Sequence, residues 1–313
     1  MIILNKTKKN TAKIIIAVLL ILILIASIGF NVYFFFFDEY YDIFNRSGWK
    51  SYLQSTDQIY IMEAGILKSG LEFKEGRNFK IKYDFENEEY PVLIEKYKID
   101  EIAGDGTEFE KAKNLMSEFA WRLYHKSNYD NSVDMNAIAL LEYSLDNREQ
   151  GINCRNKAQI LNEMCLALGI YSRKVWIVPN SVYDGDCHVV NEVWDTSLNK
   201  WVMLDITHNQ YWVDENGTPL SVIEIRTKGA NQEFCTAVWA GDDLSDLQGS
   251  KTENIASFLY IMKNVYRIEY CDVQTVGESE DRYYLSPKNF EPENEYVSDQ
   301  AISPESCESS PID

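Results

Sequence analysis

Three residues of this chain have the side-chain types and surroundings needed for nucleophilic chemistry: Cys154, His188 and Asp205. Cys154 directly precedes a helical pattern, so its thiol is expected at a helix N-terminus, where the partial positive charge favours the thiolate. His188 and Asp205 fall on two β-rich segments, His188–Trp194 and Trp201–Asp205. A histidine can take up and return a proton, and a carboxylate on its other nitrogen fixes the tautomer. The three residues predict a cysteine nucleophile that acts on amides.

Helices come first and strands second in the segment that must position these residues. Thr107-x-x-Glu110 is a capping box that predicts a helix, Asp134 is expected to cap a second, and a third is expected from Arg155 to Leu168 with Gly169 as its stop. Three β-rich segments follow: Arg173–Val178, His188–Trp194 and Trp201–Asp205. This order predicts an α+β fold with helices packed on an antiparallel sheet over residues 101–275, which ends in a C-terminal helical extension.

Residues 38–100 precede this domain and are predicted to be a β-rich extension. Phe79–Tyr83 alternates apolar and polar residues, as a half-buried strand does. The stretch VLIEKYKI, between Pro91 and Ile99, suggests a second strand. Together they predict a small sheet or hairpin.

The first segment has the composition of a membrane anchor. Residues 1–13 contain four lysines and no acid, and residues 14–37 are apolar without a charge. That run is long enough to cross a hydrocarbon core of roughly 30 Å, and the positive-inside rule leaves residues 1–13 in the cytoplasm. A cleaved signal peptide is the alternative, but the run is too long and no small-residue cleavage site ends it. The prediction is a single-pass protein of a bacterial cell membrane with its domain outside.

The C-terminal residues 276–313 are acidic and rich in Ser, Glu and Pro. Such a composition buries little apolar area, so the residues from about 287 onward are expected to be disordered, Cys307 included. The six cysteines show no CxxC spacing, and the sequence assigns no disulfide among them.

A formal net charge of −19 limits the partners that the chain can have. It disfavours nucleic acid and anionic lipid as partners. It suits a cationic or amine-bearing substrate, although most of these acids are expected simply to lie on a solvated surface. No cofactor is expected.

Four sequence blocks around these residues resemble the transglutaminase-like superfamily. They are, in family order, Gly151-Ile-Asn-Cys154, Gly169-Ile-Tyr-Ser-Arg173, His188-Val-Val-Asn-Glu192-Val-Trp194 and Trp201-Val-Met-Leu-Asp205. Each block alone is a weak signal, whereas the ordered set is specific. The chain departs from the usual pattern by an extra residue between Gly151 and Cys154, by the polar Cys187, and by Ile206-Thr207 where Pro-Thr is common. The resemblance covers about residues 107–213.

The resemblance implies a papain/transglutaminase-like core with a Cys154–His188–Asp205 catalytic triad. Cys154 would attack a peptide or protein amide, such as one of the cell envelope, and form a thioester. Water would then give hydrolysis and an amine would give transamidation, with hydrolysis favoured because water is abundant. Backbone N–H groups at the helix start would bind the oxyanion, and Gln150 is an auxiliary candidate by analogy with papain-like sites.

Other interpretations stay open at this point. Taken singly, each of the three residues is more often structural than catalytic, and the domain can serve as a silent peptide-binding or scaffold module. An assembly factor that works through the membrane segment is a further alternative. Glu192 shares a strand face with His188, but a structural role is favoured, as it is for Arg173. A metal site from Cys187, His188 and His208 matches no closed zinc spacing, so no metal is predicted.

Overall fold

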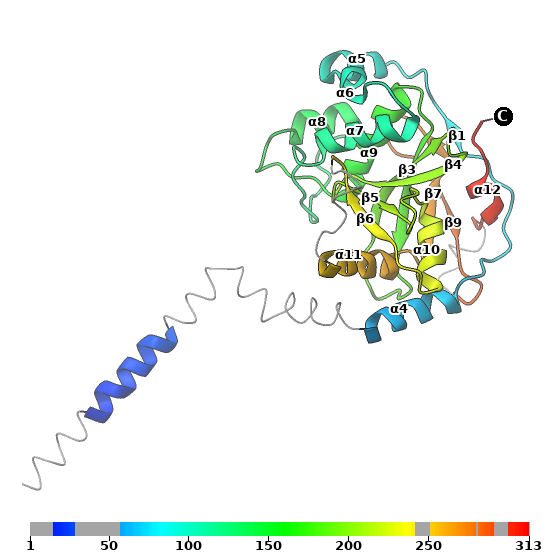
Figure 1. The fold of residues 1–313 in the computed structure, drawn as a ribbon. Coiled ribbons are helices and arrows are strands. Elements are labelled where there is room, and N and C mark those ends of the chain that lie inside the picture. The colour runs from blue at the N-terminus through cyan, green and yellow to red at the C-terminus, as the bar shows by residue number, and fades with distance from the viewer. Residues whose placement is uncertain (1–14, 29–56, 242–250, 280, 291–299, 313) are drawn as a thin grey trace, which may run out of the picture. The chain divides into compact units, whose positions relative to one another are not determined.

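The computed structural model describes residues 15–28, 57–241, 251–279, 281–290 and 300–312. The chain divides into two compact units, Met1–Thr56 and Asp57–Asp313. The second unit contains all the predicted site residues and is drawn with its elements labelled in Figure 1.

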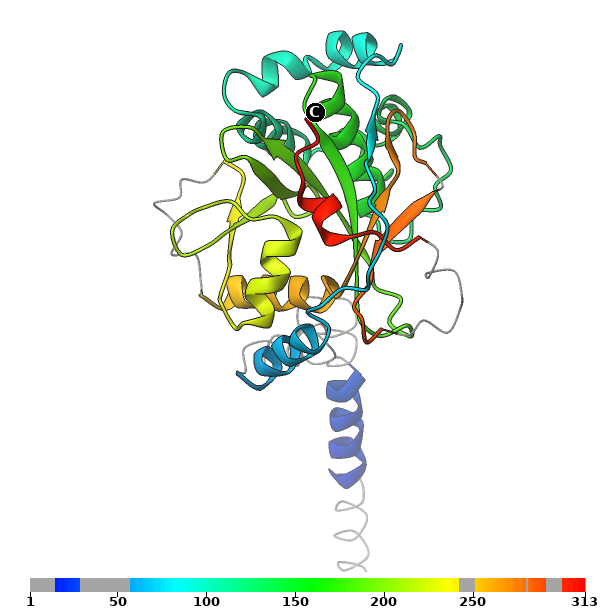
Figure 2. The same ribbon diagram turned by 90° about the vertical axis from the view of Figure 1, so that its right-hand side faces the viewer.

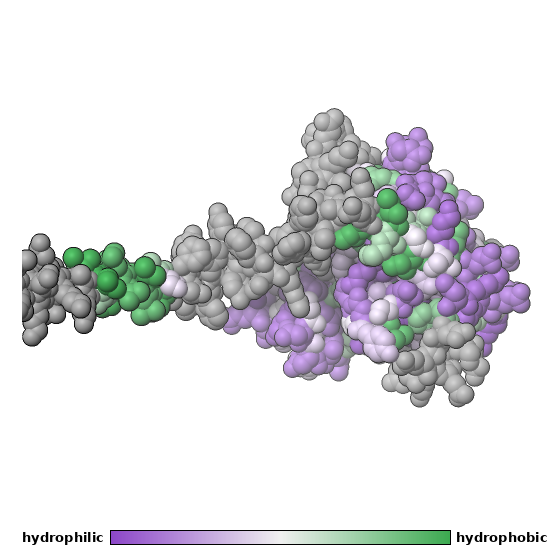
Figure 3. Space-filling view, turned by 90° about the horizontal axis from the view of Figure 1, so that it is seen from below, coloured by the Kyte–Doolittle hydropathy of each residue, from purple (hydrophilic) through white to green (hydrophobic). Residues whose placement is uncertain are grey.

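The described part of the first unit is one helix over residues 15–28, whose residues are all exposed. Its surface is largely hydrophobic in Figure 3. The rest of the predicted span 14–37 lies outside the described residues. Within the described part of the chain, no helix combines the length and hydropathy needed to cross a membrane.

A seven-stranded sheet forms the centre of the second unit. Its strand order is β6-β5-β4-β3-β2-β7-β9, and every neighbouring pair is antiparallel. The strands are β2 (Ser172–Val178), β3 (His188–Asp195), β4 (Lys200–Asp205), β5 (Gln210–Val213), β6 (Thr236–Trp239), β7 (Arg267–Cys271) and β9 (Arg282–Leu285). A separate parallel pair joins β1 (Lys82–Tyr83) to β8 (Val273–Gln274).

Helices cover both faces of this sheet (Figures 1 and 2). On one face, an apolar core joins the sheet to α5 (Tyr90–Tyr97), α6 (Ile99–Ala103), α7 (Glu108–Phe119), α8 (Ala137–Ser144) and α9 (Cys154–Ala167). On the other, a second core joins it to α4 (Asp57–Ser69), α10 (Val222–Ala230) and α11 (Lys251–Asn264). The predicted α+β fold with an antiparallel sheet is confirmed, and the sheet is enclosed from both sides.

Two helices begin at capping boxes, and the sequence predicted the one that opens α7. In α7, the Glu110 N–H donates to Thr107 Oγ1 at 3.3 Å, and Glu110 Oε2 accepts the Thr107 N–H at 2.9 Å. In α9, Asn153 and Asn156 make the equivalent reciprocal pair. Gly169, at φ 72°, ends α9 in a left-handed conformation that glycine adopts without strain. Helix α8 is capped by Asn136, two residues after the predicted cap.

A tight hairpin between β3 and β4 brings His188, at the start of β3, and Asp205, at the end of β4, to the same end of these two strands. Asp195 Oδ1 accepts from the Leu198 N–H at 3.0 Å, and Asn199 takes a positive φ of 52°, which asparagine tolerates. Since the strands are antiparallel, the start of β3 lies beside the end of β4. The catalytic candidates at these two strand ends are therefore neighbours.

The strand predicted within residues 91–99 is wrong, because this stretch forms α5. Pro91 lies at the first helical turn, where its missing N–H costs nothing and its fixed φ suits a helix. Tyr90 and Leu93 are buried on one side, while Val92 is 48% exposed. Of the other predicted strand, Phe79–Tyr83, only Lys82 and Tyr83 form β1. With α4 also helical, residues 57–100 are not β-rich.

The predicted disorder of the C-terminal segment is also wrong where the structure describes it. Residues 300–312 contain α12 (Pro304–Glu308), whereas β9 ends just before the predicted start of disorder. Ile302 and Cys307 are buried, and the Phe79 N–H donates to Ser306 Oγ at 3.0 Å. Figure 2 shows α12 beside the earlier chain segment that provides Phe79. A few apolar side chains hold this segment although its average composition is polar.

Candidate active site

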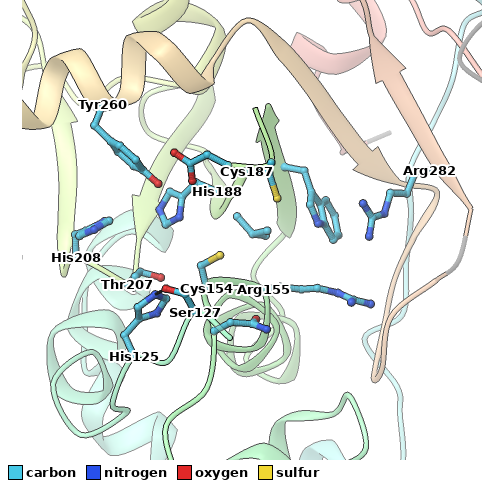
Figure 4. Close-up of a pocket in the computed structure, with 15 residues that line it drawn as sticks. His125, Ser127, Cys154, Arg155, Cys187, His188, Thr207, His208, Tyr260 and Arg282 are labelled. Atoms are coloured by element: carbon cyan, nitrogen blue, oxygen red, sulfur yellow. Dashed lines mark hydrogen bonds between the residues drawn. The ribbon is translucent and has the colours of Figure 1, made fainter. Parts of the chain in front are cut away.

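A pocket of about 450 Å³ lies where α9 begins, beside the start of β3. Cys154 and His188 line it together (Figure 4), and Asp205, which is not a lining residue, contacts His188. The lining residues include members of α9, β2, β3 and α11, and also Arg282 of β9 in the acidic C-terminal segment. The fold therefore brings together the three residues that the sequence singled out.

Cys154 is the first residue of α9 and is partly buried. The capping box takes the N–H groups of Asn153 and Asn156, so the cap leaves the Cys154 N–H unused at the helix end. The Cys154 side chain packs against Ala158, Trp176 and other apolar neighbours. The thiol thus lies where the helix dipole favours its anion and where an N–H group can bind an oxyanion.

His188 connects the thiol to a buried carboxylate. Its Nε2 lies 2.8 Å from Asp205 Oδ2, and both side chains are almost fully buried. This contact leaves Nδ1 as the ring nitrogen available to Cys154, whose pKa His188 lowers. Asp205 is fixed in turn, because its Oδ1 accepts from the N–H groups of Thr207 at 2.9 Å and His208 at 3.3 Å.

The electrostatics of these groups favour a thiolate–imidazolium pair. Burial opposes ionisation of Cys154, but the hydrogen bond and positive charge of His188, with the Val189 N–H, hold the thiol's pKa below its usual value. Burial also opposes the His188 cation, but the Asp205 charge and the hydrogen bonds to Asp205 and Cys154 raise the pKa of His188 to about 10. Burial opposes ionisation of the Asp205 carboxylate, but the charges and hydrogen bonds of His188 and His208 hold its pKa far below its ordinary range.

His208 is a member of this cluster that the sequence suggested only as a metal ligand. Its Nδ1 lies 2.7 Å from the same Asp205 oxygen that His188 contacts, and its side chain is 45% exposed. The two imidazole rings lie 5.2 Å apart. The ligand atoms of His188, Asp205 and His208 lie within 4.8 Å of one another, so these three residues have the donor set for a metal ion. The sequence feature that could have indicated this role of His208 is its position three residues after Asp205.

The two auxiliary candidates lie elsewhere. Gln150 does not line the pocket, and its Oε1 accepts from Asn147 Nδ2 at 2.5 Å. Glu192 is fully buried in β3, where its Oε2 accepts from Arg173 Nη2 at 2.6 Å and its Oε1 accepts from the Val222 N–H at 2.8 Å. The structure therefore does not bring Gln150 or Glu192 to the thiol, and Arg173 and Glu192 have the structural role that the sequence favoured.

We expect Arg173→Met to lower the free energy of unfolding by about 3–5 kcal/mol, because it leaves the Glu192 carboxylate buried without its cation. The Arg173 guanidinium also stacks 3.9 Å from the Trp201 ring centroid and 4.6 Å from that of Tyr270. Urea unfolding of the full chain measures the loss. The double variant Arg173→Met/Glu192→Leu should recover part of it, since no charge then stays buried. Equal stability of Arg173→Met and wild type would contradict a structural role for the pair.

Several lining residues were not predicted from the sequence. Arg155, Tyr260 and Arg282 come from three elements that are far apart in the chain. In Figure 4 Tyr260 and His208 lie on one side of the reactive pair, and Arg155 and Arg282 lie on the other. No local pattern in the sequence links these residues, because only the folded sheet brings them together.

Comparisons with known proteins give one family match and one similar structure. Residues 96–206, about a third of the chain, match the Transglutaminase-like superfamily. A solved structure named "a Putative Cysteine Protease from Cytophaga hutchinsonii" is similar at 18% identity with a TM-score of 0.30. The similarity covers 42% of this chain and 39% of that one, so the chain spans well under half of that structure. No curated protein matches the chain.

The matched residues 96–206 contain Cys154, His188 and Asp205, and they extend from the end of α5 to the end of β4. All four sequence blocks that carried the resemblance lie inside this range. The chain therefore contains a transglutaminase-like superfamily domain at residues 96–206.

Proposed function

We propose that this protein is a cysteine enzyme that acts on amide bonds through a thioester on Cys154. One observation carries the proposal: His188 lines one pocket with the Cys154 thiol, whose pKa it lowers, and contacts the buried Asp205 carboxylate at 2.8 Å. A helix N-terminus, a histidine and an oriented carboxylate around one thiol are the parts that nucleophilic amide chemistry needs. The transglutaminase-like match supports the same class of chemistry.

The residues have distinct parts in the proposed reaction. The Cys154 thiolate adds to the amide carbonyl carbon, and the N–H groups at the start of α9 stabilise the resulting oxyanion. Imidazolium of His188 gives its proton to the nitrogen as the carbon–nitrogen bond breaks, which releases ammonia or an amine. Neutral His188 then takes a proton from water, whose oxygen attacks the thioester and releases the acid. Asp205 keeps the ring oriented and stabilises its cationic form throughout.

Hydrolysis is the proposed main outcome, with transamidation as the variant in which an amine replaces water. Both outcomes share the first half-reaction, so the same three residues serve either one. The substrate is proposed to be a peptide or protein amide, and the pocket of about 450 Å³ has room for a side chain or a short peptide segment.

We also propose that residues 14–37 anchor the chain in a cell membrane, with the domain on the outer side and envelope peptides or surface proteins among its substrates. Four lysines before the uncharged apolar run support this orientation. Fractionation of cells that express the full chain tests the placement. Recovery of the protein in the soluble fraction without detergent would contradict it.

The thioester is the species that tests the proposed chemistry. Peptides with glutamine or other amide groups, offered to the full chain and quenched in acid, should leave an acyl adduct on Cys154 that mass spectrometry detects. Hydroxylamine should remove the adduct, because it attacks thioesters. Peptides that bind the domain but never acylate Cys154, across a broad amide set, would favour the silent binding module instead.

A further inference from the structure

One end of the pocket is formed by two arginines. Arg155 follows Cys154 on α9, and Arg282 begins β9. Both line the pocket, and Figure 4 shows them together on the side away from His208 and Tyr260. Their side chains are 36% and 30% exposed, so their guanidinium groups remain accessible from the pocket.

The carboxylates behind these arginines do not neutralise them fully. Glu278 pairs with Arg155 but also with Lys174 Nζ, at 2.6 Å. Glu269 lies 3.4 Å from Arg282 Nη1 and 4.0 Å from Arg267 Nη1. Two carboxylates therefore face four cations, and neither carboxylate lines the pocket. This end of the pocket carries a net positive charge.

The two guanidinium groups also have hydrogen-bond donors to spare. A guanidinium has five N–H donors, and the hydrogen bonds of Arg155 and Arg282 to protein atoms go to one glutamate each among the described residues. Arg155 Nε is buried without a hydrogen-bond partner in that part of the chain. The Arg282 guanidinium stacks 4.3 Å from the centroid of the Trp176 ring, which fixes its plane. Planar, pre-oriented donors of this kind match the two oxygens of a carboxylate.

One acid lines the pocket among the described residues, Asp186, and it shares Lys263 Nζ with Asp184, at 2.9 Å from each carboxylate. The positive charge therefore belongs to the Arg155–Arg282 end, which differs in sign from the chain, whose net charge of −19 suggested a cationic substrate. Local charge at a site decides which ligand binds there, whereas net charge acts at longer range and is screened by salt.

We propose that the Arg155–Arg282 end of the pocket binds a carboxylate, so that the enzyme selects amide substrates with a carboxylate close to the scissile bond. The claim of substrate selection rests on the proposed function. Binding of an anion at the two arginines can be tested without turnover. An acidic side chain and a free peptide C-terminus would present the same chemical group. Both arginines act as binding residues that set specificity.

Alkylation of Cys154 by iodoacetate and by iodoacetamide tests the anion site directly. The two reagents are similar in size and differ by one negative charge. Because both attack the same thiol, the ratio of their rates cancels any change in the thiolate fraction. We expect Arg155→Gln and Arg282→Gln each to lower the iodoacetate-to-iodoacetamide ratio about threefold, and the double variant about tenfold.

Controls separate this result from general electrostatics and from misfolding. Lys288→Gln removes one positive charge at an exposed residue paired with Glu72, away from the pocket lining, and should leave the ratio unchanged. Arg282→Lys keeps the charge and should retain most of the preference. A ratio that is the same in wild type, both single variants and the double variant would overturn the proposal, even if Cys154 is fully reactive.

Matched peptides then identify the source of the carboxylate. In one pair, the residue beside the scissile amide is glutamate in one peptide and glutamine in the other. In the second pair, the C-terminus is free in one peptide and amidated in the other. A higher kcat/KM for the acid form of either pair, reduced at least about threefold in Arg155→Gln/Arg282→Gln, supports the site and identifies the group it binds. Equal kcat/KM values within both pairs would overturn the specificity claim. A failure of the proposed function would instead appear as no acylation with any peptide.

Discussion

Cys154→Ala is expected to reduce amide turnover by roughly ten-thousandfold or more, because it removes the atom that forms the thioester. Cys154→Ser should lose nearly as much, since a serine hydroxyl at this site has a far higher pKa than the thiol and His188 cannot hold it ionised. Turnover of an amide peptide by the purified full chain measures both. Residual turnover should come from substrate binding and from the N–H groups at the start of α9.

The second cysteine of the pocket provides a matched control for this loss. Cys187 lines the same pocket, and partial desolvation of its sulfur together with the nearby Cys154 charge raises the pKa of its thiol. Cys187→Ala should therefore retain at least about a tenth of the activity. Comparable losses in the Cys187 and Cys154 variants would place the nucleophile elsewhere or show that the pocket tolerates no change.

His188→Ala is expected to cost about as much as the loss of the thiol, because His188 supplies both the charge that holds the thiolate and the proton that the leaving amine needs. Its removal also leaves burial unopposed, which raises the pKa of Cys154. Asp205→Asn should lose less, since an amide oxygen still accepts from the ring but no longer stabilises its charge. Turnover measured from pH 5 to pH 11 separates these effects.

The pH profile of the wild type follows from the same two groups. Activity needs Cys154 ionised and His188 protonated, so it should rise as the pH passes the lowered pKa of the thiol. It should fall as the pH passes the pKa of His188, raised to about 10. His208→Asn is the matched control, because His208 contacts the same Asp205 oxygen from a more exposed position. It should keep the shape of the profile and lose less than about tenfold in rate.

Much of the reactive centre could be predicted from sequence because its parts are encoded locally. The helical pattern that follows Cys154 places this residue at a helix start, and the β3–β4 hairpin places His188 near Asp205. Each of these features needs only a few neighbouring residues. The order of the segments then predicted the antiparallel sheet with its helices. The structure adds helices on the second face of the sheet.

The errors and omissions involve residues whose environment is set at long range. The stretch that forms α5 carries a pattern that fits either a strand or a helix, and Pro91 decides for the helix. The C-terminal segment is ordered by contacts with residues about two hundred positions earlier, such as that between Ser306 and Phe79. Arg282 reaches the pocket only because β9 pairs with β7 at the sheet edge. A local composition average cannot detect any of these contacts.

The measurement that tests the central claim most directly is the rate of Cys154 alkylation by iodoacetamide as a function of pH, in the full chain and in His188→Ala. A neutral reagent reports the thiolate fraction without contribution from the arginines. The account predicts that Cys154 titrates below the ordinary thiol pKa of about 8.5 in wild type and above it in His188→Ala. If the Cys154 thiol had the same pKa in both proteins, at or above the ordinary thiol value, the result would contradict an activated Cys154–His188 pair. It would also contradict the proposed amide chemistry.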